Sequence, residues 1–192
     1  GIIGLESYFK KNLNEHIEKV EPLINAIHVG VKRTADIVTS LGHYSRQDNL
    51  AKTKCDIHSI IDNCLTMLHN QLKNKAEIVK NYTNQTYTLT ANEGKLHQAF
   101  LNIISNAGQA IENKGVIQIS TQIVNSKLLI SIQDNGCGIN NENMGKIFDP
   151  FFTTKEAGQG TGLGLSITHR IIENHSGTIT PISNGPGCGS TF

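Results

Sequence analysis

The most restrictive feature of this sequence is a run in which glycine occupies every second position, at Gly158, Gly160, Gly162 and Gly164, before a helical pattern begins. Glycine loses more backbone entropy on folding than other residues, so this spacing predicts a loop rather than a regular element. Such a loop lets backbone amides approach an anion, and the N-terminus of the following helix favours phosphate. The run alone is more typical of a plain flexible loop, so its meaning depends on the rest of the chain.

Composition excludes several classes of protein. The 192 residues suffice for one domain and a smaller appendage, and the net charge of +1 comes without acidic or basic blocks, so neither nucleic acid nor an anionic membrane is indicated as a partner. No apolar run approaches the roughly 20 residues that span a bilayer, and no signal peptide opens the chain. The four cysteines form no Cys-x-x-Cys pair and the eight histidines show no ligand spacing, which fits a reducing cytoplasm without a zinc site.

Residues 1–47 are predicted to form two helices. Pro22 suits the first turn of the second helix, where an amide N–H has no partner in any case. The apolar seam of this helix comprises Leu23, Ile27, Val31, Thr34, Val38, Leu41 and Ser45. Two helices alone cannot bury such a seam, so we expect a second copy of the chain to complete a four-helix bundle.

The rest of the chain mixes helical and strand patterns. We expect a helix after its cap at Asp56, strands over 76–82 and 85–90 joined by a turn at Asn84, and a helix over 92–111. A strand pair over 116–123 and 128–133, a helix over 163–174, and strands over 177–181 and in the last residues complete the pattern. This order, with its short connections, favours an α+β sandwich with helices on one face of a mixed sheet.

The helix over 92–111 carries a polar stripe of Gln98, Asn102 and Asn106, which are four apart and share one face. Asparagine is a poor helix former, so two of them in mid-helix require a reason. An amide oxygen is a ligand that Mg²⁺ accepts alongside water and substrate phosphates. The alternative is an ordinary solvated face.

The segment Asp134-Asn135-Gly136-Cys137-Gly138-Ile139 directly follows an apolar strand. Its composition is typical of a turn. As a site, the Asp134 carboxylate can accept a hydrogen bond from an exocyclic amine, while the two glycines let the backbone lie against a flat ring. Cys137 receives no role in either interpretation.

Three phenylalanines around a proline, Phe148, Phe151 and Phe152, precede the glycine run. Such residues are typical core anchors. Here they can hold the ends of a mobile segment, Thr153–Thr161, that acts as a lid. Lys155 is the only cation of that lid, and it is either solvated or a partner for phosphate.

Together these four features resemble the N, G1, F and G2 boxes of sensor histidine kinases, closest to the nitrogen-regulator type, from about residue 54 to the end. The matching segments are Asn102-x-x-x-Asn106-Ala107, Asp134-x-Gly136-x-Gly138, Phe148-x-Pro150-Phe151-Phe152 and Gly160-Thr161-Gly162-Leu163-Gly164-Leu165. The resemblance implies a Bergerat-type (GHKL) α/β sandwich that binds ATP over residues 51–192, after a dimerisation and phosphotransfer hairpin over residues 1–50. It implies Mg²⁺-dependent transfer of the γ-phosphoryl group of ATP to a histidine, for relay to an aspartate of a response regulator.

The resemblance also implies residue roles. Asp134 would receive the adenine amino group near Thr191, Asn106 would ligate Mg²⁺, and Asn102 and Lys155 would be catalytic. Main-chain amides of the glycine run would wrap the phosphates. The ATP-binding set implied in this way is Asn102, Asn106, Gln109, Asp134, Gly136, Gly138, Ile139, Phe148, Lys155, Gly160, Thr161, Gly162, Leu163, Gly164, Leu165 and Thr191.

Two departures from the family pattern matter. Gln109 stands where many members have Lys or Arg, which leaves Lys155 as the expected cationic contact to phosphate. No His-Glu-x-x-x-Pro acceptor box is present, because His16, His28 and His43 are not followed by Glu and then Pro. The chain also begins and ends inside apolar patterns, so we expect a cytoplasmic fragment with a truncated last strand. Its acceptor histidine, and any membrane anchor, would lie in missing upstream regions.

Three alternatives follow from the same residues. Type II topoisomerases, Hsp90 chaperones and MutL proteins share the ATP fold but hydrolyse ATP, typically with a glutamate base where this chain has Asn102, a poor general base. Serine kinases of the anti-sigma type lack the helical hairpin expected over residues 1–47. A non-enzymatic helical dimer module would have a degenerate nucleotide pocket. The four intact boxes argue against such degeneracy.

Overall fold

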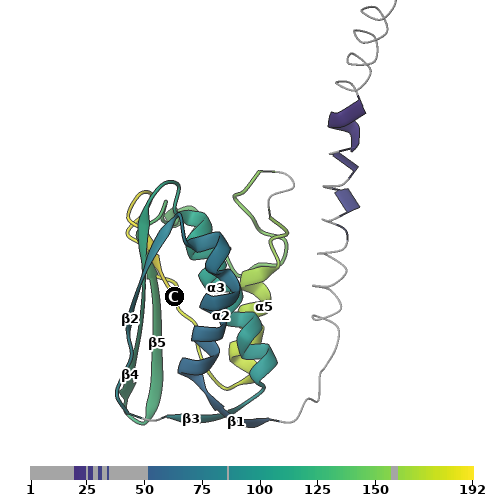
Figure 1. The fold of residues 1–192 in the computed structure, drawn as a ribbon. Helices are drawn as coiled ribbons and strands as arrows, with labels where there is room; N and C mark the ends of the chain where they lie inside the picture. Colours follow the sequence, from purple (N-terminus) through teal and green to yellow (C-terminus); the bar gives the residue numbers. More distant parts are fainter. Residues whose placement is uncertain are drawn as a thin grey trace, which may run out of the picture. The chain divides into compact units, whose positions relative to one another are not determined.

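The computed structural model describes residues 20–24, 26, 27, 30, 31, 34, 52–85, 87–156 and 160–192. The chain divides into two units, residues 1–46 with 154–161 and residues 47–153 with 162–192. The labelled helices and strands of Figure 1 all belong to the second unit. None of the helices in the described ranges combines the length and apolarity that a bilayer crossing requires.

In the first unit, each described residue between 20 and 34 is helical, as the sequence predicts for this part of the second helix. The Thr34 hydroxyl donates to the Gly30 carbonyl, one turn back, at 2.9 Å. Leu23, Ile27 and Val31 are 63–66% exposed, so the part of the seam that is described is uncovered. Its remaining positions, Val38, Leu41 and Ser45, and the predicted first helix lie outside the described residues.

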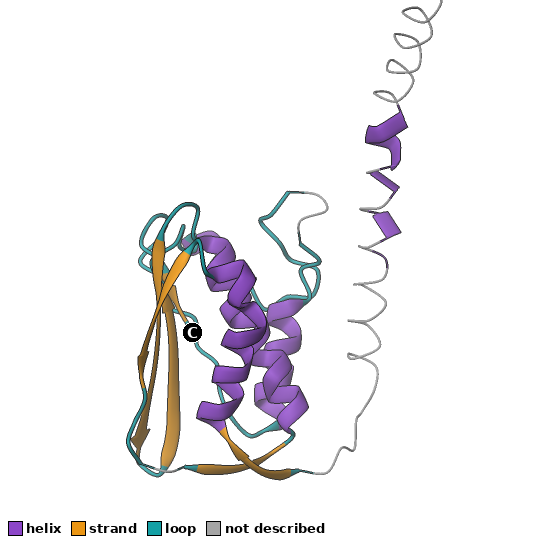
Figure 2. Cartoon of the chain, in the orientation of Figure 1, coloured by secondary structure: helices purple, strands orange, loops and turns teal. Residues whose placement is uncertain are grey.

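The second unit has a sheet layer and a helix layer (Figures 1 and 2). The four strands lie in the order β2 (Ala76–Asn81), β4 (Gly115–Val124), β5 (Lys127–Asp134) and β6 (Ser190–Thr191). β2 is parallel to β4 and the other two pairs are antiparallel, so the sheet is mixed. Helices α2 (Ile57–Leu72), α3 (Glu93–Ala110) and α5 (Gly164–Asn174) cover one face. The predicted α+β sandwich is confirmed.

Local sequence signals place several element ends correctly. The Asp56 carboxylate caps α2 by accepting from the His58 amide at 3.1 Å, and Asn92 caps α3 by accepting from the Lys95 amide at 3.1 Å. Between β4 and β5, Asn125 and Ser126 have φ of 50° and 61°, which is the geometry of a tight two-residue hairpin turn.

The two strands predicted over 76–82 and 85–90 exist as β2 and β3 (Thr88–Ala91), but they do not form a hairpin around Asn84. β2 pairs with β4, while β3 pairs with β1 (Thr53–Asp56) in a separate two-stranded sheet. Burial explains the split, since Ile78 of β2 packs against the core alongside Ile117 of β4. The short polar β1 offers no alternating pattern that could have revealed it.

Near the C-terminus, residues 177–181 are not a strand, and the chain makes only an isolated bridge between Ile182 and Thr191. Pro181 cannot donate a ladder hydrogen bond, which limits pairing there. The short helix α4 (Asn141–Met144), capped by Asn140, was not predicted.

The core lies between the sheet and the helices, with Ile117, Ile119 and Ile132 facing the helical layer at 2% exposure or less. Burying each of these side chains contributes about 2 kcal/mol. α3 packs against α2, α5 and β5, so its apolar face is covered on three sides. The direction in which its polar stripe points is therefore fixed by the core.

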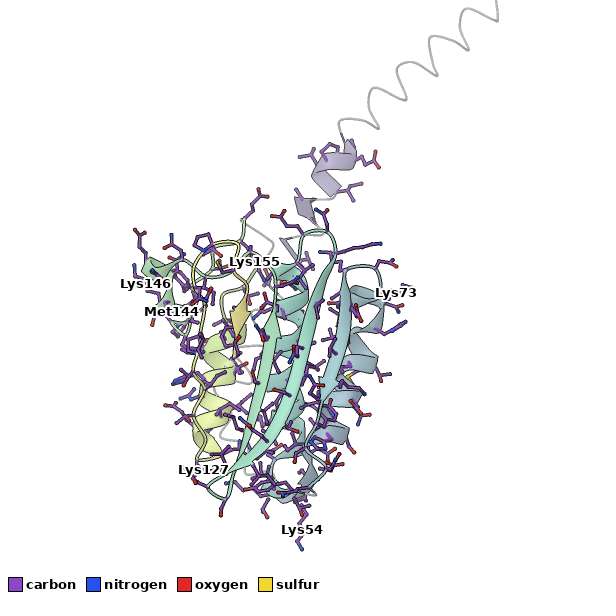
Figure 3. The ribbon with its side chains drawn as sticks, turned by 90° about the vertical axis from the view of Figure 1, so that its left-hand side faces the viewer. Lys54, Lys73, Lys127, Met144, Lys146 and Lys155 are labelled. Carbon is purple, nitrogen blue, oxygen red and sulfur yellow. The ribbon has the colours of Figure 1, made fainter. Side chains whose placement is uncertain are left out.

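The end of β5 defines one end of the unit. Figure 3 shows Lys54 and Lys127 at one end, and Lys73, Met144 and Lys146 at the other. β5 begins at Lys127, so Asp134 lies toward the end that carries Met144 and Lys146.

Candidate functional site

The Asp134 carboxylate is the centre of the site at the end of β5. Its side chain is 4% exposed, and it accepts from the Gly136 amide at 2.8 Å and from the Ser190 hydroxyl of β6 at 2.6 Å. An ionised carboxylate offers about four acceptor positions, and these bonds use two of them. Asp134 is thus held in place by two donors and keeps the capacity to accept from a third, such as an amine.

Glycines bring the backbone close together around this carboxylate. A Cβ on Gly136 would lie 2.5 Å from the Ala110 carbonyl oxygen, and one on Gly189 would collide with the Asp134 carbonyl oxygen. Gly138 has φ of +72°, where a Cβ would meet the Gly185 carbonyl. We call this arrangement, residues 134–138 with 187–190, the Asp134 corner. Its two stretches of backbone lie at van der Waals contact with each other and with Ala110 and Gly185, which only glycine permits.

Main-chain hydrogen bonds fix the corner to its surroundings. The Cys137 amide donates to the Ala110 carbonyl at the end of α3 at 2.9 Å, and the Gly189 amide donates to the Gly136 carbonyl at 3.1 Å. The bond that joins α3 to the corner is therefore a main-chain hydrogen bond and involves no side chain.

Asn102 joins α3 to α5. Its Nδ2 donates to the Gly164 carbonyl at 3.1 Å and to the Thr168 hydroxyl at 3.3 Å, and Thr168, which is fully buried, donates to the same carbonyl at 2.9 Å. Because the amide nitrogen is engaged, Oδ1 is the acceptor that Asn102 can offer. Among the described residues Oδ1 has no hydrogen-bond partner.

Asn106 lies one turn further along the same face of α3 and is half-buried. Gln109 lies at the end of the helix, where its exposed side chain donates to the Ser105 hydroxyl at 3.2 Å. This bond lies within α3. Its predicted contact with ATP stays a prediction.

The N-terminus of α5 follows a strained turn. Gly162 has φ of +67°, a Cβ there would collide with the Phe151 backbone, and the Phe151 amide donates to the Gly162 carbonyl at 2.9 Å. Leu163, 2% exposed, is the N-cap residue and supplies no side-chain cap. Among the described residues, α5 therefore begins without a side-chain cap from its N-cap residue, and a helix N-terminus of this kind suits an anion.

The remaining predicted residues of the second unit surround these features. The Ile139 amide donates to the Ser183 hydroxyl at 3.0 Å, Thr191 exchanges two main-chain bonds with Ile182, and the Phe148 ring lies 4.7 Å from the ring of His169 on α5. Leu165 is half-buried in the first turn of α5. Lys155, Gly160 and Thr161 belong to the first unit, so their roles stay predictions.

Sequence reasoning missed two hydroxyl groups. Ser190 of β6 donates to Asp134 of the neighbouring strand β5, and no pattern in the sequence indicates that these two residues are partners. Thr168 lies four residues after Gly164, so its contact with that carbonyl was within reach of helical periodicity.

The donor set fits ATP and Mg²⁺ chemically. A buried carboxylate acceptor suits an amine, uncapped helix amides suit phosphate, and amide oxygens suit a hard cation that keeps water and phosphate ligands. In the described ranges, no group of three or more His, Cys, Asp or Glu side chains forms a metal cage. A bound Mg²⁺ would therefore depend on Asn106, water and the phosphates.

Comparison with known proteins identifies the family. Residues 91–192, more than half of the chain, match the model of the histidine kinase-, DNA gyrase B- and HSP90-like ATPases. The signal transduction histidine-protein kinase AtoS of Escherichia coli is 37% identical over 158 residues, which cover 81% of this chain and 26% of AtoS. The Escherichia coli sensor histidine kinase ZraS is 34% identical over all of this chain, which covers 40% of ZraS. The chain thus spans between a quarter and two fifths of these relatives.

Solved structures of histidine kinases also resemble this chain. The nucleotide-free catalytic domain of histidine kinase ThkA is 28% identical with a TM-score of 0.66, covering 74% of this chain and 95% of that domain. Histidine kinase ThkA in complex with the response regulator protein TrrA gives 27% identity and a TM-score of 0.72, with 88% of this chain and 48% of that one covered. The chain therefore belongs to the family of histidine kinase-, DNA gyrase B- and HSP90-like ATPases, and its ATP-binding domain is of the sensor histidine kinase type.

Proposed function

We propose that this chain binds Mg-ATP at the Asp134 corner and is the catalytic part of a sensor histidine kinase. It transfers the γ-phosphoryl group to a histidine of the dimerisation domain, from which an aspartate of a response regulator receives it. In this proposal residues 1–50 belong to the dimerisation hairpin and residues 51–192 form the catalytic domain. The cytoplasm supplies both ATP and the reducing conditions that suit the four free cysteines.

The observation that carries the proposal is the buried Asp134 carboxylate, held by Gly136 and Ser190 with acceptor capacity to spare. In the proposed complex it accepts from the adenine amino group, while Gly136 and Gly138 present backbone rather than side chains to the flat ring. Burial strengthens this bond, because water does not compete for the carboxylate.

At the other end of the site, α5 and the asparagine stripe receive the phosphates. The N-terminus of α5 would receive the phosphates, Asn106 would hold Mg²⁺, and Asn102 would stand beside it with its Oδ1 atom as an acceptor. When bound, Mg²⁺ neutralises charge that develops on the phosphoryl oxygens. Positioning and charge neutralisation are most of what phosphoryl transfer requires of a protein.

Transfer to histidine is favoured over hydrolysis by the state of Asn102. An amide cannot take a proton from water, and its nitrogen is engaged by Gly164 and Thr168. A neutral imidazole is already a nucleophile and requires no such base.

Calorimetry with ATP and ADP in Mg²⁺ tests the pocket. Asp134→Asn removes the acceptor charge and Asn106→Ala removes the metal ligand, and each should weaken binding at least about tenfold, some 1.4 kcal/mol. Glu77→Gln and Asn63→Ala, which change exposed residues of β2 and α2, are matched controls that should bind like the wild type. Equal affinities in all four variants would remove the pocket assignment. In the full-length protein, acid-labile label from γ-labelled ATP on histidine tests the transfer step.

Homodimerisation through the hairpin is the proposed assembly. Its support is the exposed seam of Leu23, Ile27 and Val31, since uncovered apolar residues at helical spacing require a partner. Light scattering should give the mass of a dimer for the wild type and of a monomer for Ile27→Glu. A monomeric wild type at all concentrations would contradict this assembly. For the response regulator, phosphorylation of a receiver-domain aspartate by the full-length protein is the corresponding test.

A further inference from the structure

Two of the four cysteines lie on neighbouring segments of the Asp134 corner. Cys137 is in the turn after β5, and Cys188 is in the segment that leads into β6. Both side chains are exposed and both thiols are free, whereas Cys55 and Cys64 are buried at 3% and 0% exposure. Among the described residues, the two accessible thiols therefore both belong to the Asp134 corner.

Main-chain hydrogen bonds hold these two segments side by side. The Gly187 amide donates to the Cys137 carbonyl at 2.7 Å, and the Gly189 amide donates to the Gly136 carbonyl at 3.1 Å. Cys188 lies between the two donors and thus opposite the Gly136–Cys137 peptide. These two bonds keep the two backbones in direct contact, and a disulfide requires Cα atoms about 4.4–6.8 Å apart.

The neighbours of both cysteines leave room for a bridge. Cys137 lies between Gly136 and Gly138, and Cys188 lies between Gly187 and Gly189, so no adjacent side chain blocks an approach of the sulfur atoms. The Cys137 thiol now contacts the Gly138 carbonyl at 3.6 Å, and the Cys188 thiol contacts the Pro186 carbonyl at 3.8 Å. A thiol is a weak donor, so rotation of both side chains away from these carbonyls costs little.

We propose that Cys137 and Cys188 form a reversible dithiol–disulfide pair, a redox modification site whose oxidant is a small disulfide such as glutathione disulfide. One cysteine thiolate attacks the oxidant, which forms a mixed disulfide and releases one glutathione thiolate. The second cysteine thiolate then attacks the mixed disulfide, which forms the Cys137–Cys188 bond and releases the second glutathione. Two protein thiols are oxidised, one small disulfide is reduced, and the two thiol protons pass to the two glutathione thiolates.

The pair is coupled to Asp134 through the residues beside it. Gly136, which precedes Cys137, and Ser190, two residues after Cys188, are the two donors that hold the carboxylate. The backbone at Gly138 and Gly189 is tightly packed, since a Cβ on Gly138 would collide with the Gly185 carbonyl and one on Gly189 with the Asp134 carbonyl. Any strain of the closed bridge therefore acts on the backbone that carries the two Asp134 donors. This coupling rests on the proposed function, and it predicts that oxidation weakens ATP binding at least about threefold.

Peptide mapping tests the site itself. The 192-residue chain is incubated with glutathione disulfide and alkylated without reduction. Denaturing, non-reducing size exclusion then selects the monomeric fraction, which carries no interchain bond, and this fraction is digested with trypsin. We expect residues 128–146 joined to residues 171–192, at a mass two hydrogens below the sum of the peptides. Cys137→Ser and Cys188→Ser should each abolish the link and leave a glutathione adduct on the remaining thiol. Cys55 and Cys64 should stay unmodified, since both are buried and burial raises the pKa of the Cys64 thiol to about 11.

Separate glutathione adducts on Cys137 and Cys188 without a link in the wild type, or a link found only between chains, would overturn the site. Calorimetry then tests the coupling with ATP on reduced protein, on oxidised protein and on the Cys137→Ser/Cys188→Ser double variant treated in both ways. The expected result is weaker binding only in the oxidised wild type. Equal affinity of oxidised and reduced wild type would overturn the coupling. Failure of the reduced wild type to bind ATP would contradict the proposed function while the mapped disulfide stands.

Discussion

The Asp134 corner and the contact between α3 and α5 hold the two ends of the same site by different means. At the corner, main-chain hydrogen bonds and glycines fix the backbone, and a side chain at Gly136 or Gly189 would overlap neighbouring atoms. Between α3 and α5, the polar contact consists of side chains, with Asn102 and Thr168 meeting the Gly164 carbonyl. Gly164 itself has ordinary space around it.

The difference teaches how much each end can adjust. Backbone at van der Waals contact has no rotamers with which to accommodate a change, so the corner is the stiffer end and, in the proposed function, suits a ligand of constant shape such as a purine ring. Side chains can rotate or exchange a partner for water, so in the proposed function the α3–α5 end suits phosphates and a metal that shift during a reaction.

The largest effect is expected at the corner. Gly189→Ala places a Cβ against the Asp134 carbonyl at φ of +69°, and should lower the free energy of unfolding by at least about 3 kcal/mol. Urea unfolding followed by circular dichroism measures this. Gly145→Ala is the matched control, because that position is open and has φ of −75°. If the two variants were equally stable, the corner could not be rigid in the sense argued above.

A smaller loss is expected between the helices. Thr168→Val keeps the shape of a fully buried side chain but removes the hydroxyl that bonds Gly164 and Asn102, and should cost about 1–2 kcal/mol of unfolding free energy. Combining it with Asn102→Ala in a double-mutant cycle should give a coupling energy of about 0.5 kcal/mol or more. Strict additivity would show that the two side chains do not act as one contact.

The smallest effect is expected at Gly164. A Cβ there would lie 3.6–3.9 Å from Asn102 atoms, an ordinary contact, and alanine favours a helix. Gly164→Ala should therefore change the free energy of unfolding by no more than about 0.5 kcal/mol. Calorimetry on this variant sharpens the comparison, because lost ATP affinity at unchanged stability would indicate that phosphate approaches this backbone. A loss of stability as large as that of Gly189→Ala would erase the distinction between the two ends.

The sequence predicted the helices well because their signals are local. Asp56 and Asn92 cap α2 and α3 through bonds to amides two and three residues away, and the hairpin turn at Asn125-Ser126 needs only its own residues. The pairing of the strands was harder to predict from the sequence. β2 pairs with β4 and β3 with β1 because of burial against helices, a long-range property that short strand patterns do not carry.

The same division holds for the site and for the whole chain. The sequence alone determined the candidate chemistry, because the residue types of the four boxes, above all Asn102, Asn106 and Asp134, carry it in their order and spacing. Only the tertiary structure decided which groups lie beside them, Ser190 on Asp134 and Thr168 beside Asn102. It alone also brought the segments of Cys137 and Cys188 together. The physical reason is that hydrogen bonds between distant segments depend on how the core packs, and packing is a property of the folded chain as a whole.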